Sequence, residues 1–178
     1  MNIVMIGTGY VGLISGLCFA EFGFNVNLVD NDNARLSNLK KNIMPIYEPG
    51  LEQLFNKHFV DTKRIKLFEK LQDCISSADV IFITVGTPSK RIDDDADLSD
   101  VYSVAEEISM NIKKYCLIVT KSTVPVGTSR KIKEIIEQKI DKNMFDVASN
   151  PEFLREGSAL NDFMRPDRVV IGIESKKG

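Results

Sequence analysis

The first residues with a recognisable chemistry form a glycine-rich loop near the N-terminus. Gly7, Gly9 and Gly12 make the pattern G-x-G-x-x-G, between a short apolar run at residues 3–6 and a longer apolar stretch. In a strand–loop–helix unit, the first glycine makes a tight turn, the second lets the backbone approach a pyrophosphate, and the third lets the helix lie close to the strand. The start of that helix favours an anion. The pattern predicts a dinucleotide site, and the alternative is a glycine-rich turn in a plain α/β domain.

An acidic and a basic residue follow the next predicted strand, residues 25–29. Asp30 lies eighteen residues beyond Gly12, where a carboxylate can accept hydrogen bonds from the hydroxyls of an adenosine ribose. Arg35 is near the place of a 2′-phosphate, so NADP is an alternative. Asp30 would repel that phosphate, no second basic residue precedes Lys40, and a guanidinium also fits along adenosine. We therefore expect NAD as the cofactor.

Three further polar segments each follow a predicted strand: VGTP at 85–88, KSTVPVGT at 121–128 and NPEFLREG at 150–157. The carboxyl ends of parallel strands meet at the crevice where ligands bind, so we expect these segments and the glycine loop along one edge of a sheet. The side chains of Thr87 and Thr123 are small hydroxyls that fit beside a nicotinamide ring.

Two carboxylates in the last segment are candidates for proton transfer. Glu152 and Glu156 are four residues apart, so on a helix they would share one face, with Cβ atoms about 6 Å apart. Beside a cofactor, such a pair can move protons and order water. The plainer interpretation is two exposed acids in the first turn of a helix, where they would stabilise its dipole.

Strand and helix patterns alternate along the chain. The predicted strands are residues 2–6, 25–29, 65–68, 80–85, 117–120, 145–149 and 169–173, and the predicted helices are residues 11–22, 36–43, 51–55, 101–112 and 132–140. Gly23 is expected at the end of the first helix, Ser99 as the N-cap of the fourth, and Thr128 or Ser129 at the start of the fifth. This order predicts an α/β fold, a doubly wound, mostly parallel, Rossmann-like sheet with residues 3–6 at its centre.

Composition excludes several classes of protein. The chain has 178 residues, 43% of them hydrophobic and 27% charged, which is typical of a globular domain and unlike a disordered or collagen-like one. Its formal net charge of −2 offers no basic excess, so we expect no nucleic-acid partner. The acidic run at residues 93–97 lacks the spacing of a calcium loop, so we expect a solvated loop and no metal.

The first 20 residues are uncharged and invite comparison with a membrane helix or signal peptide. Their glycines and the lack of a preceding basic segment argue against both, so we expect no membrane partner. Cys18, Cys74 and Cys116 have no disulfide or metal spacing, and we expect them to be buried in a reducing, cytoplasmic compartment. His58 has no partner motif and is expected at the surface.

Taken in order, these motifs resemble those of the UDP-glucose/GDP-mannose dehydrogenase family. The matching segments are GTGYVGL at 7–13, Asp30, IYEPGL at 46–51, TP at 87–88, KSTVPVGT at 121–128, NPEFLREGSA at 150–159 and PDRVVIG at 166–172. They cover the whole chain. The last two are most similar to the UDP-glucose branch, with GDP-mannose enzymes as close alternatives and UDP-N-acetylhexosamine enzymes, such as those acting on UDP-N-acetylmannosamine, as less similar ones.

The resemblance implies NAD-dependent oxidation of a sugar C6 alcohol to a carboxylate, which for UDP-glucose yields UDP-glucuronate. It implies that the cofactor contacts Gly7, Gly9, Tyr10, Val11, Gly12, Asp30, Arg35, Thr87, Thr123 and Glu156. It implies that the sugar nucleotide is held, partly by backbone, by Glu152, Phe153, Leu154, Arg155 and Glu156. The implied catalytic residues are Thr123, Glu152 and Glu156, with Glu152 as the base for the water that hydrolyses a thioester. Tyr10 matches an aromatic residue of the family's loop and is expected to pack against the pyrophosphate turn.

The chain also departs from the family. The family's nucleophile is a cysteine in a G-F-G-G-x-C segment, and neither that segment, nor the family's Lys and Asn on the following helix, nor its second nucleotide-binding domain is present. We therefore expect residues 1–178 to be the N-terminal NAD-binding domain of a longer, homo-oligomeric enzyme, inactive without its central and C-terminal substrate domains. A stand-alone NAD(H)-binding module is the alternative, and Glu152 and Glu156 argue against it.

Overall fold

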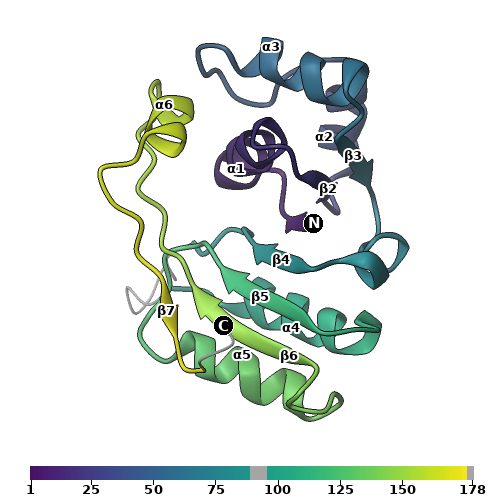
Figure 1. Cartoon of the computed structure of the whole chain (residues 1–178), viewed down its shortest axis with the longest axis vertical. Coiled ribbons are helices and arrows are strands. Elements are labelled where there is room, and N and C mark those ends of the chain that lie inside the picture. The colour runs from purple at the N-terminus through teal and green to yellow at the C-terminus, as the bar shows by residue number, and fades with distance from the viewer. Residues whose placement is uncertain (89–95, 176–178) are drawn as a thin grey trace.

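A seven-stranded sheet, in the order β3-β2-β1-β4-β5-β6-β7, forms the centre of the computed structural model, which describes residues 1–88 and 96–175 (Figure 1). The strands are β1 (Asn2–Ile6), β2 (Asn25–Val29), β3 (Ile65–Phe68), β4 (Val80–Ile83), β5 (Cys116–Thr120), β6 (Phe145–Ser149) and β7 (Gly172–Ile173). Neighbouring strands from β3 to β6 are parallel, and β7 alone runs antiparallel, to β6. The prediction of a doubly wound, mostly parallel sheet with β1 between β2 and β4 is confirmed.

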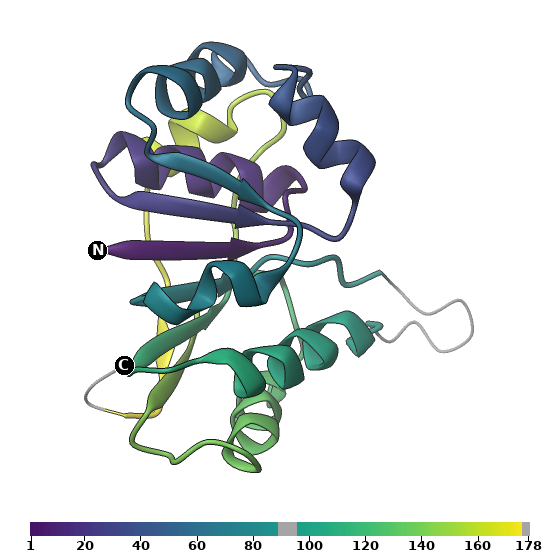
Figure 2. The ribbon, with the colours of Figure 1, turned by 90° about the vertical axis from the view of Figure 1, so that its right-hand side faces the viewer.

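Helices cover both faces of this sheet (Figure 2). They are α1 (Tyr10–Glu21), α2 (Asn33–Lys40), α3 (Leu51–Asn56), α4 (Ser99–Asn111), α5 (Thr128–Glu137) and α6 (Ala159–Met164), with a π-helical turn at Lys57–Asp61 and 3-10 turns at Leu71–Asp73 and Ile75–Ser77. Side chains alternate across β1, so Val4 and Ile6 join the core under α4 and α5, whereas Ile3 and Met5 join the core under α1 and α3.

Several predicted boundaries were wrong by a few residues. The second helix ends at Lys40, and Ile43 is exposed, because Asn42 takes a left-handed conformation with φ +61°. Ser99 is the first residue of α4 and not its cap; the cap position is Leu98, while Asp97 accepts a hydrogen bond from the Ser99 N–H at 3.0 Å. The expected start of the fifth helix at Thr128 is confirmed.

The last predicted strand is also shorter than its apolar sequence indicates. Only Gly172 and Ile173 pair with β6, and Val169 and Ile171 are exposed. The predicted strand at residues 80–85 is shorter too: β4 ends at Ile83, although the Thr84 N–H still donates to Ile6 O at 2.9 Å.

The prediction for His58 was wrong, because this side chain is buried and only 2% exposed. Its Nε2 lies 2.6 Å from Glu21 Oε2 at the end of α1, and its Nδ1 lies 3.0 Å from Thr62 Oγ1. The π-helical turn that follows α3 carries His58 back against α1.

The three cysteines are buried and free, as expected. The uncharged N-terminal stretch divides into β1, the glycine loop and the 12-residue α1. Within residues 1–88 and 96–175, the structure contains no helix with the length and apolar character needed to cross a membrane. Residues 93–95 of the acidic run lie outside the described residues.

Candidate functional site

The glycine loop joins β1 to α1 under tight packing constraints. Gly7 has φ +100°, and its N–H donates to Val29 O at 2.8 Å. A Cβ on Gly12 would lie 1.9 Å from Gly7 O and 2.5 Å from Thr84 Oγ1, so helix and loop approach more closely than any side chain allows. A Cβ on Gly9 would meet no atom within 4 Å, which leaves the space beside that backbone open.

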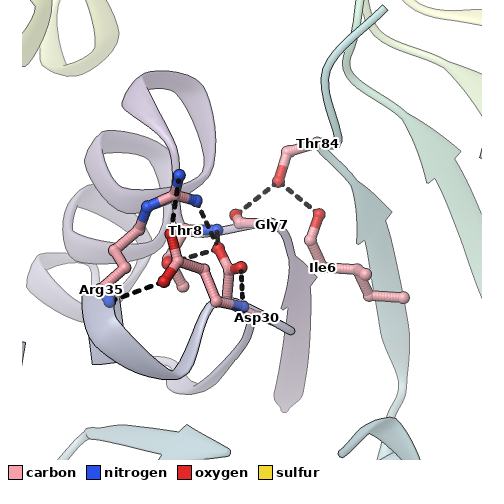
Figure 3. A network of polar contacts seen from close by, with 7 residues as sticks. Ile6, Gly7, Thr8, Asp30, Arg35 and Thr84 are labelled. Atoms are coloured by element: carbon pink, nitrogen blue, oxygen red, sulfur yellow. Dashed lines mark hydrogen bonds and ion pairs between the residues drawn. The ribbon is translucent and has the colours of Figure 1, made fainter. Parts of the chain in front are cut away.

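Thr84 holds the loop from the neighbouring strand end. Its Oγ1 lies 2.8 Å from Ile6 O and 2.9 Å from Gly7 O, and the hydroxyl donates to these carbonyls (Figure 3). The residue is the first beyond β4 and is buried. Thr84 was not among the predicted site residues, and the signal for it in the sequence was a hydroxyl residue placed directly after an apolar strand.

Asp30 is the centre of a second polar network, at the end of β2 (Figure 3). Its Oδ2 accepts hydrogen bonds from Thr8 N–H at 2.7 Å, Thr8 Oγ1 at 2.6 Å and Arg35 Nη1 at 2.8 Å, and its Oδ1 accepts one from Asp32 N–H at 2.9 Å. Burial by itself raises the pKa of Asp30, but the hydrogen bonds from Thr8 and Asp32 and the charge of Arg35 outweigh burial and lower it. Asp30 is therefore an ionised acceptor at neutral pH.

Thr8 is a second residue that sequence analysis missed. It lies between two glycines of the loop, is fully buried, and ties that loop to Asp30 through both its N–H and its hydroxyl. A side chain with a hydroxyl inside a G-x-G pattern, followed by a distant acid, was the signal for this contact.

A cavity of about 470 Å³ opens between the glycine loop and α4. Its wall includes Gly7, Gly9, Asp30, Arg35, Thr84, Val85 and Gly86, together with three acidic residues, Glu69, Asp100 and Glu107. The volume lies in the range of small-molecule sites, about 300–1,000 Å³. These acidic residues disfavour the additional 2′-phosphate of NADP by charge repulsion, and Arg35, the one guanidinium in this wall, is already paired with Asp30.

Thr87 and Thr123 lie beyond that cavity, on the loops that follow β4 and β5. The Thr87 hydroxyl donates to Thr123 O at 3.3 Å, and the Ser122 hydroxyl donates to Val85 O at 2.8 Å. These two loops are therefore held side by side at the carboxyl end of the sheet. Thr123 also borders a neighbouring cavity of about 370 Å³ that reaches Gly172.

Glu152 and Glu156 do not lie on a helix, so the shared face that their spacing would give on a helix does not form. Residues 150–155 have no regular secondary structure, and α6 begins only at Ala159. Glu152 Oε1 accepts a hydrogen bond from Leu154 N–H two residues on, which is a local turn that competes with a helix. Gly157, with φ +85°, then reverses the chain before α6.

The remaining residues of this segment point in different directions. Phe153 and Glu156 are exposed, whereas Leu154 packs against the apolar core under α1. The Arg155 guanidinium pairs with Asp162 of α6 at 2.6 Å, so this ion pair ties the segment to the helix that follows it.

Tyr10 has partners other than the expected pyrophosphate turn. Its hydroxyl donates toward Glu48 Oε2 at 3.2 Å and Arg155 O at 3.1 Å, and so connects α1 to the 150–159 segment. Burial, followed by the negative charges of Glu48, Glu156 and Glu152, raises the pKa of Tyr10 to about 12. The two predicted catalytic carboxylates thus lie close enough to the start of α1 to influence the phenol.

A larger and mostly apolar cavity, of about 520 Å³, lies on the α1 side of the sheet, away from the glycine loop. Lys121 is buried in its wall, with Nζ 3.0 Å from Asn150 Oδ1 and 5.4 Å from the centre of the Phe163 ring. Burial lowers the pKa of Lys121, against the opposing effect of the Glu152 charge.

Among the described residues, no three His, Cys, Asp or Glu side chains gather as metal ligands. Burial raises the pKa of each of the three thiols, Cys18, Cys74 and Cys116, to about 12, so none of them supplies a thiolate at neutral pH.

Comparison with known proteins gives, along the entire chain, the family that the sequence motifs resemble. Residues 1–178 match the sequence model of the NAD binding domain of the UDP-glucose/GDP-mannose dehydrogenase family. A UDP-glucose 6-dehydrogenase from Rhizobium meliloti is 50% identical over 178 residues, and one from Rickettsia prowazekii is 48% identical over 177 residues. The chain covers 40% of each of these two relatives, while 100% and 99% of the chain is matched.

Solved structures agree with this assignment. A UDP-glucose dehydrogenase from Pyrobaculum islandicum has a TM-score of 0.91 at 36% identity, covering 99% of this chain and 41% of that one. A GDP-mannose dehydrogenase from Pseudomonas aeruginosa has a TM-score of 0.93 at 35% identity, covering 99% of this chain and 42% of that one. With the glycine loop, the ionised Asp30 and the adjoining cleft in place, the chain belongs to the UDP-glucose/GDP-mannose dehydrogenase family and corresponds to its NAD binding domain.

Proposed function

We propose that the complete protein oxidises the C6 alcohol of UDP-glucose to the carboxylate of UDP-glucuronate, and that residues 1–178 are its N-terminal NAD-binding domain. The alcohol and one water lose four electrons as two hydrides, which pass to two NAD⁺. The observation that carries this proposal is the convergence of the glycine loop, the two threonine-bearing loops and the 150–157 segment on one edge of the sheet. The names of the relatives that are 46–50% identical support UDP-glucose as the substrate.

The residues of the cleft fit NAD. The open space beside Gly9 accommodates a pyrophosphate at the start of α1. Tyr10 and Val11, the first two residues of α1, contact the cofactor next to it. Asp30 accepts three donors on Oδ2 but one on Oδ1, so Oδ1 retains capacity for a ribose hydroxyl. Bound NAD⁺ supplies the hydride acceptor, and Arg35, Thr87, Thr123 and Glu156 complete its surroundings.

The 152–156 segment holds the sugar nucleotide in this proposal, through Glu152, Phe153, Leu154, Arg155 and Glu156. Glu152 is the general base that takes a proton from the hydrolytic water, with Thr123 orienting that water. The Leu154 N–H fixes the direction of the Glu152 carboxylate. The thiol that forms the acyl intermediate comes from outside residues 1–178, since burial raises the pKa of each cysteine of this chain to about 12.

The experiment is to supply the complete protein and NAD⁺ with UDP-glucose, GDP-mannose or UDP-N-acetylmannosamine in separate reactions and follow NADH absorbance. We expect turnover with UDP-glucose and two NADH for each UDP-glucuronate formed. Preference for GDP-mannose, whose dehydrogenase has the fold similarity described above, would redirect the substrate assignment. NADH binding without turnover of any of these sugars would favour a non-catalytic NAD(H) module.

Two further proposals concern the setting of the enzyme. The complete protein is a homo-oligomer, which its molar mass in solution tests. It acts in the cytoplasm, where three free, buried cysteines are compatible with a reducing compartment. Fractionation of cells that express the protein would test this location.

A further inference from the structure

Glu48 is the one buried residue of the loop at residues 41–50. It lies between α2 and α3 and is 5% exposed, whereas its neighbours Tyr47 and Pro49 are exposed. None of the ion pairs found among the described residues includes it. Burying a carboxylate is costly unless hydrogen bonds replace its water, so the location of its donors is informative.

The donors to Glu48 come from two segments distant in the sequence. Its Oε2 accepts hydrogen bonds from Gly157 N–H at 2.8 Å and from the Tyr10 hydroxyl at 3.2 Å, and its Oε1 accepts one from Ala159 N–H at 2.6 Å. The Tyr10 hydroxyl also lies 3.1 Å from Arg155 O. One carboxylate therefore connects the start of α1 with the turn that enters α6.

These two segments carry the two halves of the proposed site. Tyr10 directly follows Gly9, and Gly157 directly follows Glu156. The 150–155 stretch has no regular secondary structure to hold it, so its position relative to the glycine loop depends on side-chain contacts such as these. The influence of Glu152 and Glu156 on the pKa of Tyr10 is consistent with this short separation.

We propose that Glu48 is a positioning residue that sets the Glu152–Glu156 segment against the glycine loop, with Tyr10 as the second member of the contact. Its carboxylate fixes the Gly157 and Ala159 amides, and through them the distance between the sugar-binding residues and the cofactor. This proposal rests on the proposed function in assigning the sugar nucleotide to the 152–156 segment. The hydrogen-bonded connection itself does not depend on the identity of the substrate.

Glu48→Gln is the most direct test. The Gly157 and Ala159 amides donate to different oxygens, and a glutamine amide offers only one oxygen, so one N–H would face an NH₂ group. In the complete enzyme we expect kcat/KM for the sugar nucleotide to fall about ten- to a hundredfold, as expected for losing one or two hydrogen bonds to a charged group. The KM for NAD⁺ should change much less than the kcat/KM for the sugar nucleotide, since Thr84 and Asp30 hold the glycine loop independently and Glu156 is only one of the residues around the cofactor.

Two variants make the comparison specific. Tyr10→Phe removes the hydroxyl and keeps both amide contacts, so we expect a smaller loss, of about two- to tenfold. Glu52→Gln is the matched control, since Glu52 is an exposed acid on the adjacent α3 that accepts a hydrogen bond from Asn42 at 3.0 Å. It makes the same charge change and should leave kcat and both KM values unchanged.

Amide hydrogen exchange of residues 152–159 provides a readout that does not require turnover. Glu48→Gln should accelerate exchange there about ten- to a hundredfold relative to Glu52→Gln, with little change in β1 or β4. If wild-type protein oxidises no sugar nucleotide, the proposed function fails, and the exchange result still decides whether Glu48 holds the turn.

Two outcomes would overturn the inference. One is equal exchange and equal kcat/KM in Glu48→Gln and Glu52→Gln. The other is a parallel loss of NADH affinity, unfolding temperature and turnover in Glu48→Gln, which would indicate a merely structural role. If Glu48→Gln does not fold, unchanged exchange and kinetics in Tyr10→Phe would overturn it.

Discussion

Exchanging single glycines of the cofactor loop for alanine should separate folding from ligand binding. Gly12→Ala would place a Cβ 1.9 Å from Gly7 O and 2.5 Å from Thr84 Oγ1. The first contact is with backbone, so no side-chain rotation relieves it, and α1 must move away from β1. Overpacking of this kind typically costs about 1–3 kcal/mol, and we expect at least the upper value here. For a chain of this size, that predicts a fall in the unfolding temperature of about 6–12 °C.

Gly9→Ala should behave in the opposite way. Gly9 has φ −71° and ψ −164°, which alanine adopts without strain, and its new Cβ would meet no protein atom within 4 Å. As a helix N-cap, alanine is poorer than glycine, so we expect a stability loss of about 1 kcal/mol or less. The added methyl group would occupy the space assigned to the pyrophosphate, and NADH affinity should fall at least about tenfold, which corresponds to about 1.4 kcal/mol.

The assays are thermal unfolding without ligand and titration with NADH, both on each variant. Gly127→Ala is a comparison variant that adds backbone strain without crowding, since its Cβ would meet no atom within 4 Å but its φ is +95°. Gly12→Ala with wild-type stability would contradict the close approach of helix and loop. Gly9→Ala with wild-type NADH affinity would contradict the placement of the pyrophosphate.

Three other results are expected. Asp30→Ala should weaken NADH binding about ten- to a hundredfold through the lost ribose contact, and a titration that shows NADPH binding more tightly to wild type would contradict this role. Hydrogen bonds from Lys57 and His58 lower the pKa of Glu21 from 4.5, so its stabilising contribution is present above that value and lost as pH falls through the lowered pKa. The gap in unfolding temperature between wild type and Glu21→Gln should therefore close on acidification. Residues 1–178 alone should bind NADH yet produce none from UDP-glucose and NAD⁺.

Local patterns were sufficient for the scaffold of the site. A glycine loop after a short apolar run, and an acid after the next run, predicted β1, α1, β2 and the place of Asp30 correctly. They succeeded because strand and helix periods and the need for glycine in a tight turn are properties of neighbouring residues. The central position of β1 followed from the alternation of strands and helices, since parallel strands joined by helices order themselves in few ways.

Predictions failed where a residue's state depends on a distant part of the chain. His58 is buried because the turn after α3 returns to the end of α1 and meets Glu21. Glu152 and Glu156 do not share a helix face, because a side-chain hydrogen bond and the turn at Gly157 replace the helix that their spacing favours.

Short stretches of sequence were enough to predict the class of fold, the glycine loop and the acid beside it, since each is encoded within a few residues. The convergence of Thr8 and Arg35 on Asp30, and the connection from Tyr10 through Glu48 to the turn at Gly157, depend instead on how distant parts of the chain pack. The second of these contacts spans 109 residues between Glu48 and Gly157. The physical reason is that a buried carboxylate must find hydrogen-bond donors to replace water, and which donors are within reach is set by how helices and strands pack.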